Sequence, residues 1–203
     1  MKRIHYISGL VITLFIIFHL INHVYSLFGI EEHILLMDKL RIVYRNPFAE
    51  TLLVGAVFVQ VVSGLKLFLK KRKTLLTLFD QLQIWSGVYL AIFFVFHLSA
   101  VFIGRLVLEL DTNVYFGIAG LNTFPLNLFF IPYYSLAIIS FFGHISAIHS
   151  KKMKHNIIGI TPNTQSYLIL ISGILLTIII LYGLTGGFQG VPIPNEYDIV
   201  VGK

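Results

Sequence analysis

Five long apolar stretches constrain the fold of this chain more than any other feature of its sequence. Each is long enough to cross a bilayer as a helix, which takes roughly 20 apolar residues. Valine, isoleucine, leucine and phenylalanine dominate these stretches without the two-residue alternation typical of membrane β-barrels. The sequence therefore predicts one all-α integral membrane domain over residues 1–203, a bundle of five transmembrane helices at about 4–28, 48–69, 82–105, 126–149 and 166–186.

Composition excludes several classes of protein. Hydrophobic residues make up 57% of the chain and charged residues 12%, whereas a soluble domain carries about 25% charged residues. There is no cysteine, which excludes disulfides, thiolate metal sites, iron–sulfur clusters and covalently attached c-type haem. The net charge is +6, but the basic residues lie between apolar spans. This pattern indicates membrane topology and no nucleic-acid partner.

The basic residues also predict the orientation, because cytoplasmic loops carry an excess of lysine and arginine. With the N-terminus in the cytoplasm, an odd number of spans places the C-terminus outside. We expect a multi-pass protein of a bacterial cytoplasmic (inner) membrane, with the lipid bilayer as its surroundings. In this orientation the inner segments hold Lys2, Arg3, Lys66, Lys70, Lys71, Arg72, Lys73, Lys151, Lys152 and Lys154, and the outer ones hold only Lys39, Arg41, Arg45, Arg105 and Lys203.

Local signals mark the helix ends and one long connection. Asn46-Pro47 is expected to open the second helix and Thr161-Pro162-Asn163 to precede the fifth, which Gly186-Gly187 closes. The connection at about 106–125 is expected to lie on the outer membrane surface. Its polar residues are candidates to cap a cavity below, with simple loop packing as the alternative; they are Asp111, Asn113, Tyr115 and Asn122.

Histidines inside the spans are the main functional signal, since ionisable residues in the hydrocarbon are costly and often functional. They are His19, His23, His97, His144 and His149. His19 lies about 14 residues into its helix and His97 about 15, or roughly 21 and 22 Å at 1.5 Å per residue. Because both helices run outward, the two imidazoles are expected at one depth in the outer half of the membrane.

Two neutral imidazoles at equal height on facing helices can ligate a haem iron from both sides. We therefore predict one haem b with its iron held by His19 and His97. The alternative is that both are core histidines bonded to backbone carbonyls or hydroxyls. His23, one turn further out, is predicted to support the site by meeting a propionate, a quinone oxygen or water. His149 is expected at a solvated edge.

Several motifs carry a resemblance to a known family, and their order and spacing cover nearly the whole chain. The chain resembles the cytochrome b membrane subunit of the succinate dehydrogenase/fumarate reductase (quinone) family, in its five-helix dihaem class. The motifs are Arg3-Ile4-His5-Tyr6-Ile7-Ser8-Gly9, Phe18-His19-Leu20, Leu82-Gln83-Ile84-Trp85-Ser86-Gly87, Phe96-His97-Leu98, Phe142-Gly143-His144-Ile145-Ser146 and Gly159-Ile160-Thr161-Pro162.

The resemblance implies two stacked haems. His19 and His97 match the outer ligands, and His144 matches the fourth-helix ligand of the inner haem. The second-helix ligand is replaced by Gln60, a poor ligand for iron, and that helix contains no histidine that could take its place. We therefore expect one haem, with two as the alternative. The resemblance also implies an inner haem or quinone environment that includes Arg3, His5 and Ser8.

The functional hypothesis is a cytochrome b-like electron-transfer protein that exchanges electrons with quinone and with a redox partner subunit. Whether the chain is part of a quinone-linked oxidoreductase stays open. One alternative is the membrane anchor of a succinate dehydrogenase or fumarate reductase-like complex, and another is a haem-binding membrane protein without redox turnover. A proton-coupled carrier is disfavoured, because no Asp or Glu lies deep in a span and no inverted repeat is visible.

Overall fold

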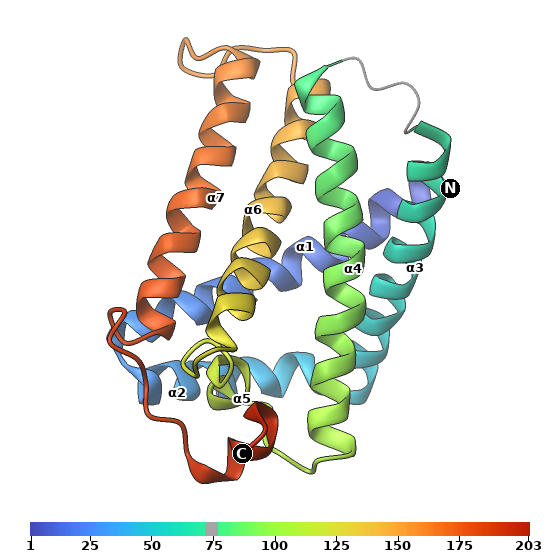
Figure 1. The fold of residues 1–203 in the computed structure, drawn as a ribbon. Helices are drawn as coiled ribbons and strands as arrows, with labels where there is room; N and C mark the ends of the chain where they lie inside the picture. The colour runs from blue at the N-terminus through green and yellow to red at the C-terminus, as the bar shows by residue number, and fades with distance from the viewer. Residues whose placement is uncertain (72–76) are drawn as a thin grey trace.

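The computed structural model contains five helices that are long and apolar enough to cross a membrane, and it describes residues 1–71 and 77–203 (Figure 1). No strand occurs in the described residues apart from an isolated bridge between Ile157 and Ile160. The prediction of an all-α membrane protein with five membrane-length helices is confirmed. They are α1 (Lys2–Val24, extended by the 3-10 turn η1, Tyr25–Phe28), α3 (Pro47–Lys71), α4 (Leu78–Leu106), α6 (Asn127–Lys152) and α7 (Pro162–Leu184).

Polar caps explain why two helices begin four residues earlier than the apolar pattern predicts. The Thr77 hydroxyl accepts a hydrogen bond from the Asp80 amide at 3.1 Å, and the Asp80 carboxylate accepts one from the Thr77 amide at 3.0 Å. This capping box adds a polar first turn to α4. Thr161 caps α7 in the same way by accepting from the Thr164 amide at 3.3 Å. Hydropathy alone does not see such turns.

The residues predicted to begin α3 and to end α7 lie at the observed ends of these helices. The Asn46 side chain accepts a hydrogen bond from the Ala49 amide at 2.9 Å, and Pro47 is the first residue of α3. Gly186 and Gly187 follow the end of α7 with φ of 57° and 69°. These left-handed conformations suit glycine, which lacks a Cβ. The expected helix starts and stops at these two places are confirmed.

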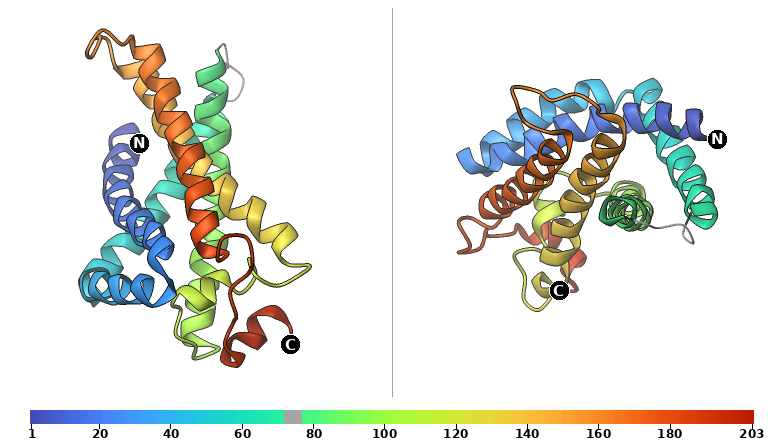
Figure 2. Two further views of the ribbon diagram at one scale, coloured as in Figure 1. Left: turned by 90° about the vertical axis from the view of Figure 1, so that its left-hand side faces the viewer. Right: turned by 90° about the horizontal axis from the view of Figure 1, so that it is seen from above.

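Neighbouring helices pack in the order α1, α3, α4, α6 and α7, and α7 returns to α1 and η1. Figures 1 and 2 show α1 running obliquely across the bundle, with the N-terminus toward the upper end of Figure 1 and the C-terminus at the lower end. We call these the upper and lower ends. Basic residues at the ends of α3 and α6 gather at the upper end. Of the predicted inner basic residues, Arg72 and Lys73 lie outside the described residues.

Three short elements cross the lower end: α2 (Ile30–Tyr44), α5 (Val114–Ile118) and η2 (Asn195–Val201) (Figure 1). None of them was predicted, because none contains an apolar stretch of about 20 residues. Gly29, with φ of 121°, turns the chain between η1 and α2. Glu31 and Glu32 occupy the first turn of α2. Negatively charged side chains at this position stabilise a helix, because the N-terminal end of its dipole is positive. The 15 residues of α2 are too few to span a membrane.

The connection at 106–125 packs against the helix bundle at its lower end (Figure 1), and its expected place on the membrane surface stays a prediction. Its Val114, Ile118 and Leu121 join the buried apolar core with side chains of α1, α4, α6 and α7. The Asn122 side chain donates to the Leu184 carbonyl at 3.0 Å and accepts from the Val191 amide at 2.9 Å. Its polar residues therefore serve loop packing, which was the alternative.

The membrane-facing sides of the long helices expose large apolar side chains, among them Phe58 (69% exposed), Trp85 (58%) and Phe129 (62%). Water would penalise such a surface, whereas lipid accepts it. Where helices meet, the packing is close: a Cβ on Gly173 of α7 would lie 2.3 Å from Cβ of Phe142 on α6. Gly55 of α3 has open space around the same position.

Gly173→Ala should destabilise the bundle, and Gly55→Ala should not. Overpacking a close contact costs about 1–3 kcal/mol, whereas alanine in open space improves helix propensity by up to about 1 kcal/mol. Thermal unfolding of the purified protein in mild detergent measures both. A melting temperature for Gly173→Ala equal to that of Gly55→Ala would contradict the close α6–α7 crossing.

Candidate functional site

Four histidines from three helices form one cluster in the lower half of the bundle. His19 and His23 come from α1, His33 from α2 and His97 from α4. Ring centroids are 4.4 Å apart for His19 and His23, 5.3 Å for His23 and His33, and 6.3 Å for His19 and His97. The structure thus brings together the two residues predicted as haem ligands. We call these four residues the histidine cluster.

The fold explains how the cluster forms. His19 and His23 share one face of α1 because they are four residues apart. The turn at Gly29 sends α2 back along α1, which brings His33 beside His23. Helices α1 and α4 do not pack directly against each other, since α4 packs mainly on α3 and α6. Side chains therefore fill the space between the helices that carry His19 and His97.

Aromatic rings enclose this pair. Phe15 stacks on His19 with ring centroids 5.4 Å apart, and Phe93 stacks on His97 at 5.0 Å. Tyr134 of α6 meets His97 edge-on at 6.3 Å. This shell holds both imidazoles in apolar surroundings, where the neutral ring, the form that ligates metals, is favoured.

The hydrogen bonding of the cluster is incomplete. A hydrogen bond joins Nε2 of His19 and Nε2 of His23 at 3.1 Å. Nδ1 of His23 and both ring nitrogens of His33 are buried without a partner among the described residues. A buried polar group left unpaired costs about 1–3 kcal/mol. Among the described residues no carbonyl or hydroxyl bonds to the ring of His19 or His97, and the core-histidine alternative stays a prediction.

The distances suit two ligands of one metal. Metal–imidazole bonds are about 2 Å long, so rings that bind one metal from opposite sides have centroids about 6 Å apart. The 6.3 Å between His19 and His97 agrees with this value. No group of three or more His, Cys, Asp or Glu side chains within 1–71 and 77–203 is arranged to hold a bare ion. A porphyrin needs only two protein ligands, because its own nitrogens supply the others.

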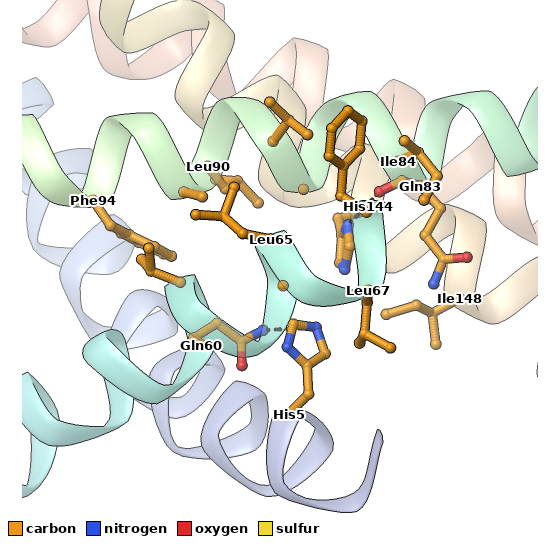
Figure 3. Close-up of a pocket in the computed structure, with 16 residues that line it drawn as sticks. His5, Gln60, Leu65, Leu67, Gln83, Ile84, Leu90, Phe94, His144 and Ile148 are labelled. Atoms are coloured by element: carbon orange, nitrogen blue, oxygen red, sulfur yellow. Dashed lines mark hydrogen bonds between the residues drawn. The ribbon is translucent and has the colours of Figure 1, made fainter. Parts of the chain in front are cut away.

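A separate cavity lies between α1, α3, α4 and α6 in the upper half (Figure 3). Its volume is about 140 Å³, and its polar lining comes from His5, Gln60, Gln83 and His144. Pockets for drug-sized ligands measure about 300–1,000 Å³, and a cavity near 150 Å³ holds roughly a benzene ring. The cavity as folded is therefore small for a macrocycle.

The Gln60 side chain is fully engaged by α1. Its carbonyl oxygen accepts from the Ser8 hydroxyl at 2.7 Å, and its amide nitrogen lies 3.2 Å from Nε2 of His5. Nδ1 of His5 in turn lies 2.8 Å from the Ser63 hydroxyl. The structure thus joins His5 and Ser8 to Gln60 in one network. Arg3, grouped with them by the family resemblance, is exposed and takes no part in it.

His144 faces this cavity from α6. Its Nδ1 lies 3.0 Å from the Gln83 carbonyl and 3.2 Å from the Ser86 hydroxyl. Nδ1 therefore carries the proton donated to the carbonyl, and Nε2 is the acceptor nitrogen. In Figure 3 the rings of His144 and His5 point toward one another, with Gln60 beside His5. His149, expected at a solvated edge, is instead half-buried and bonded to Gln165 at 2.8 Å.

The sequence reasoning missed His33, which is 0% exposed. It sits on a connection that was not expected to be helical, so it had no place relative to the spans. A usable signal was the four-residue spacing of His33, Met37 and Arg41, which share the inward face of α2. His33 and Met37 are buried, and the Arg41 side chain is 11% exposed.

Comparison of the chain with protein-family models, with curated proteins and with solved structures finds no match. The resemblance to the succinate dehydrogenase/fumarate reductase cytochromes therefore stays a prediction. The functional proposal below therefore rests on the geometry of the protein itself.

The buried position of His33 gives a pH prediction. Burial lowers the pKa of His33 from its ordinary 6.5 to about 4. Between about pH 6.5 and pH 4, His33 is therefore protonated in the unfolded chain but neutral in the folded protein. Stability should fall as the pH drops through this window, by an amount on the order of 3 kcal/mol for this group.

The measurement compares thermal unfolding of the haem-free wild type, His33→Leu and Met37→Leu between pH 7 and pH 4. His33→Leu should lose less stability over this range than the wild type, and Met37→Leu should behave as the wild type does. Identical pH slopes for all three proteins would contradict the buried neutral state of His33.

Proposed function

We propose that the chain is a membrane cytochrome b-like electron-transfer protein that holds one haem b between His19 and His97. The observation that carries the proposal is the pair of half-buried imidazoles from α1 and α4, with ring centroids 6.3 Å apart and an aromatic ring stacked on each. Imidazole is an established axial ligand of b-type haem iron, and the absence of cysteine excludes a thiolate ligand. When bound, haem supplies a one-electron carrier.

The residues around the pair would hold and orient the ligands. Phe15 and Phe93 stack on the two imidazoles and fix the planes of their rings. Tyr134 closes one side and excludes water. Ligation through Nε2 of His19 requires that His23 release its present hydrogen bond to that nitrogen. His23 would then be free to donate to a polar group at the edge of the cofactor.

The polar network at the upper cavity is an argument for one haem in the chain and against a second one in this cavity. Gln60 occupies the position that the resemblance assigns to a ligand, and Ser8 and His5 hold its amide. His144 has an available Nε2, but it faces this amide network across a cavity of about 140 Å³. Two haems, the alternative, would require this network to open.

We propose quinone in the bilayer, or a redox partner subunit, as the electron-transfer partner. The apolar outer faces of the helices are compatible with access by a lipid-soluble molecule. The positive-inside rule would place the upper end in the cytoplasm of a bacterial cell, so the histidine cluster would lie in the outer half of the inner membrane. The alternatives are an anchor for a succinate dehydrogenase-like complex and a haem-binding protein without redox turnover.

Purification in mild detergent, with a haem-to-protein ratio and oxidised and reduced absorption spectra, tests the haem proposal. We expect a b-type spectrum near one haem per chain. His19→Ala and His97→Ala should abolish it, because each removes an axial ligand, whereas His144→Ala should retain it as a matched histidine control. No haem after haem-replete expression would refute the cytochrome assignment. Two haems with a loss in His144→Ala would favour the anchor alternative.

Reduction by a quinol analogue separates electron transfer from haem storage. The oxidised wild-type protein should be reduced by a short-chain quinol, and absorbance at the reduced b-type bands measures the rate. Reduction by dithionite but not by any quinol would support the haem-binding alternative without quinone-linked turnover.

A further inference from the structure

The buried face of α2 carries polar groups that the rest of the protein leaves unused. His33 is 0% exposed, and neither of its ring nitrogens has a partner within residues 1–71 and 77–203. Beside it, Nδ1 of His23 is also buried and unpaired. More than nine in ten buried polar groups in proteins have a hydrogen-bond partner. Three unpaired nitrogens on two adjacent rings therefore point to a ligand that binds between α1 and α2.

The character of this face indicates an acceptor group. Each neutral imidazole can present one N–H donor. Further along the same face, Arg41 is paired with Asp111 at 2.9 Å, while its Nε is buried and has no hydrogen-bond partner. Of the acidic residues of α2, Glu31 and Glu32 are exposed, and Asp38 pairs with Arg41 at 3.2 Å. The ring nitrogens of His23 and His33 that have no partner among the described residues suit a carboxylate, which has several lone pairs and forms strong charge-assisted hydrogen bonds.

The position fits the acidic side chains of haem b. His33 meets His23, and His23 meets His19, so the unpaired donors lie beside a proposed ligand. They also lie toward the lower end, where α2 crosses the bundle (Figure 1). A carboxylate avoids the hydrocarbon centre and favours such an end.

We propose that His33, together with His23, binds a carboxylate side chain of the haem held between His19 and His97. This inference rests on the proposed function and adds a binding residue from outside the transmembrane helices. It also gives α2 a role, as the element that sets which edge of the cofactor faces the lower end.

The proposal predicts opposite effects in the two states of the protein. Without haem, His33→Leu replaces a ring whose nitrogens are unpaired and should leave stability unchanged or increase it. With haem, the same change removes a donor to a charged group. Hydrogen bonds to charged groups change affinity by about ten- to a hundredfold.

The test is titration of full-length haem-free protein in detergent with haem b and with its dimethyl ester, whose carboxylates are capped. The affinity ratio between the two probes is measured for each variant from the absorbance of the bound haem. The wild type should prefer haem b by about tenfold or more, and His33→Leu should bring the ratio close to one. His33→Met, with a flexible side chain that adapts to the gap, serves if the leucine variant does not fold. His33→Gln, which keeps an N–H donor, should preserve most of the ratio, and Met37→Leu is the control on the same face.

The outcomes separate this inference from the proposed function. A wild-type ratio near one, or the wild-type ratio in both His33→Leu and His33→Met, overturns the carboxylate site while the haem assignment stands. An equal loss in Met37→Leu overturns it too, because a general packing effect would then explain the change. A wild type that binds neither probe refutes the proposed function itself.

Discussion

The burial of imidazoles in apolar surroundings is the constraint on which the rest of this structure depends. A membrane helix bundle gains little from hiding polar rings, and each unpaired nitrogen costs stability. Yet His19, His23, His33 and His97 converge from three helices, and the part of the chain that the structure describes gives them one side-chain hydrogen bond. Such an arrangement persists when the fold holds it or when a ligand satisfies it. The aromatic shell and the return of α2 supply the first condition, and the proposed haem would supply the second.

The two halves of the bundle differ in how their histidines are hydrogen-bonded. In the upper half, Ser8, His5, Ser63 and Gln60 satisfy one another, and His144 bonds to the Gln83 carbonyl. In the lower half the histidines are enclosed by phenylalanine and tyrosine and remain largely unpaired. Polar groups that are already hydrogen-bonded to one another have no need of a ligand, whereas buried unpaired nitrogens are still able to bind one. This contrast is the reason that the proposed haem is assigned to the half that holds the unpaired rings.

Ion pairs at the lower end hold the elements that close it. Arg41 of α2 meets Asp111 at 2.9 Å, and the Asp111 carbonyl accepts a hydrogen bond from the Tyr197 hydroxyl of η2 at 3.0 Å. Arg105 at the end of α4 pairs with Glu50 of α3 at 2.6 Å. These contacts join α2, the 106–125 connection, the C-terminal segment and two spans. The position of His33 therefore depends on residues distant from it in the sequence.

The sequence by itself determined the five spans and their caps at Asn46-Pro47 and Thr161-Pro162, because hydropathy and capping chemistry are local properties. It could not determine α2, the packing of the 106–125 connection or the partner of His149. Short amphipathic elements take their structure from what they pack against, and hydrogen-bond partners depend on which helices become neighbours. The meeting of His33 with His23, and the engagement of Gln60 by Ser8 and His5, were decided only when the tertiary structure brought α2 and α3 against α1.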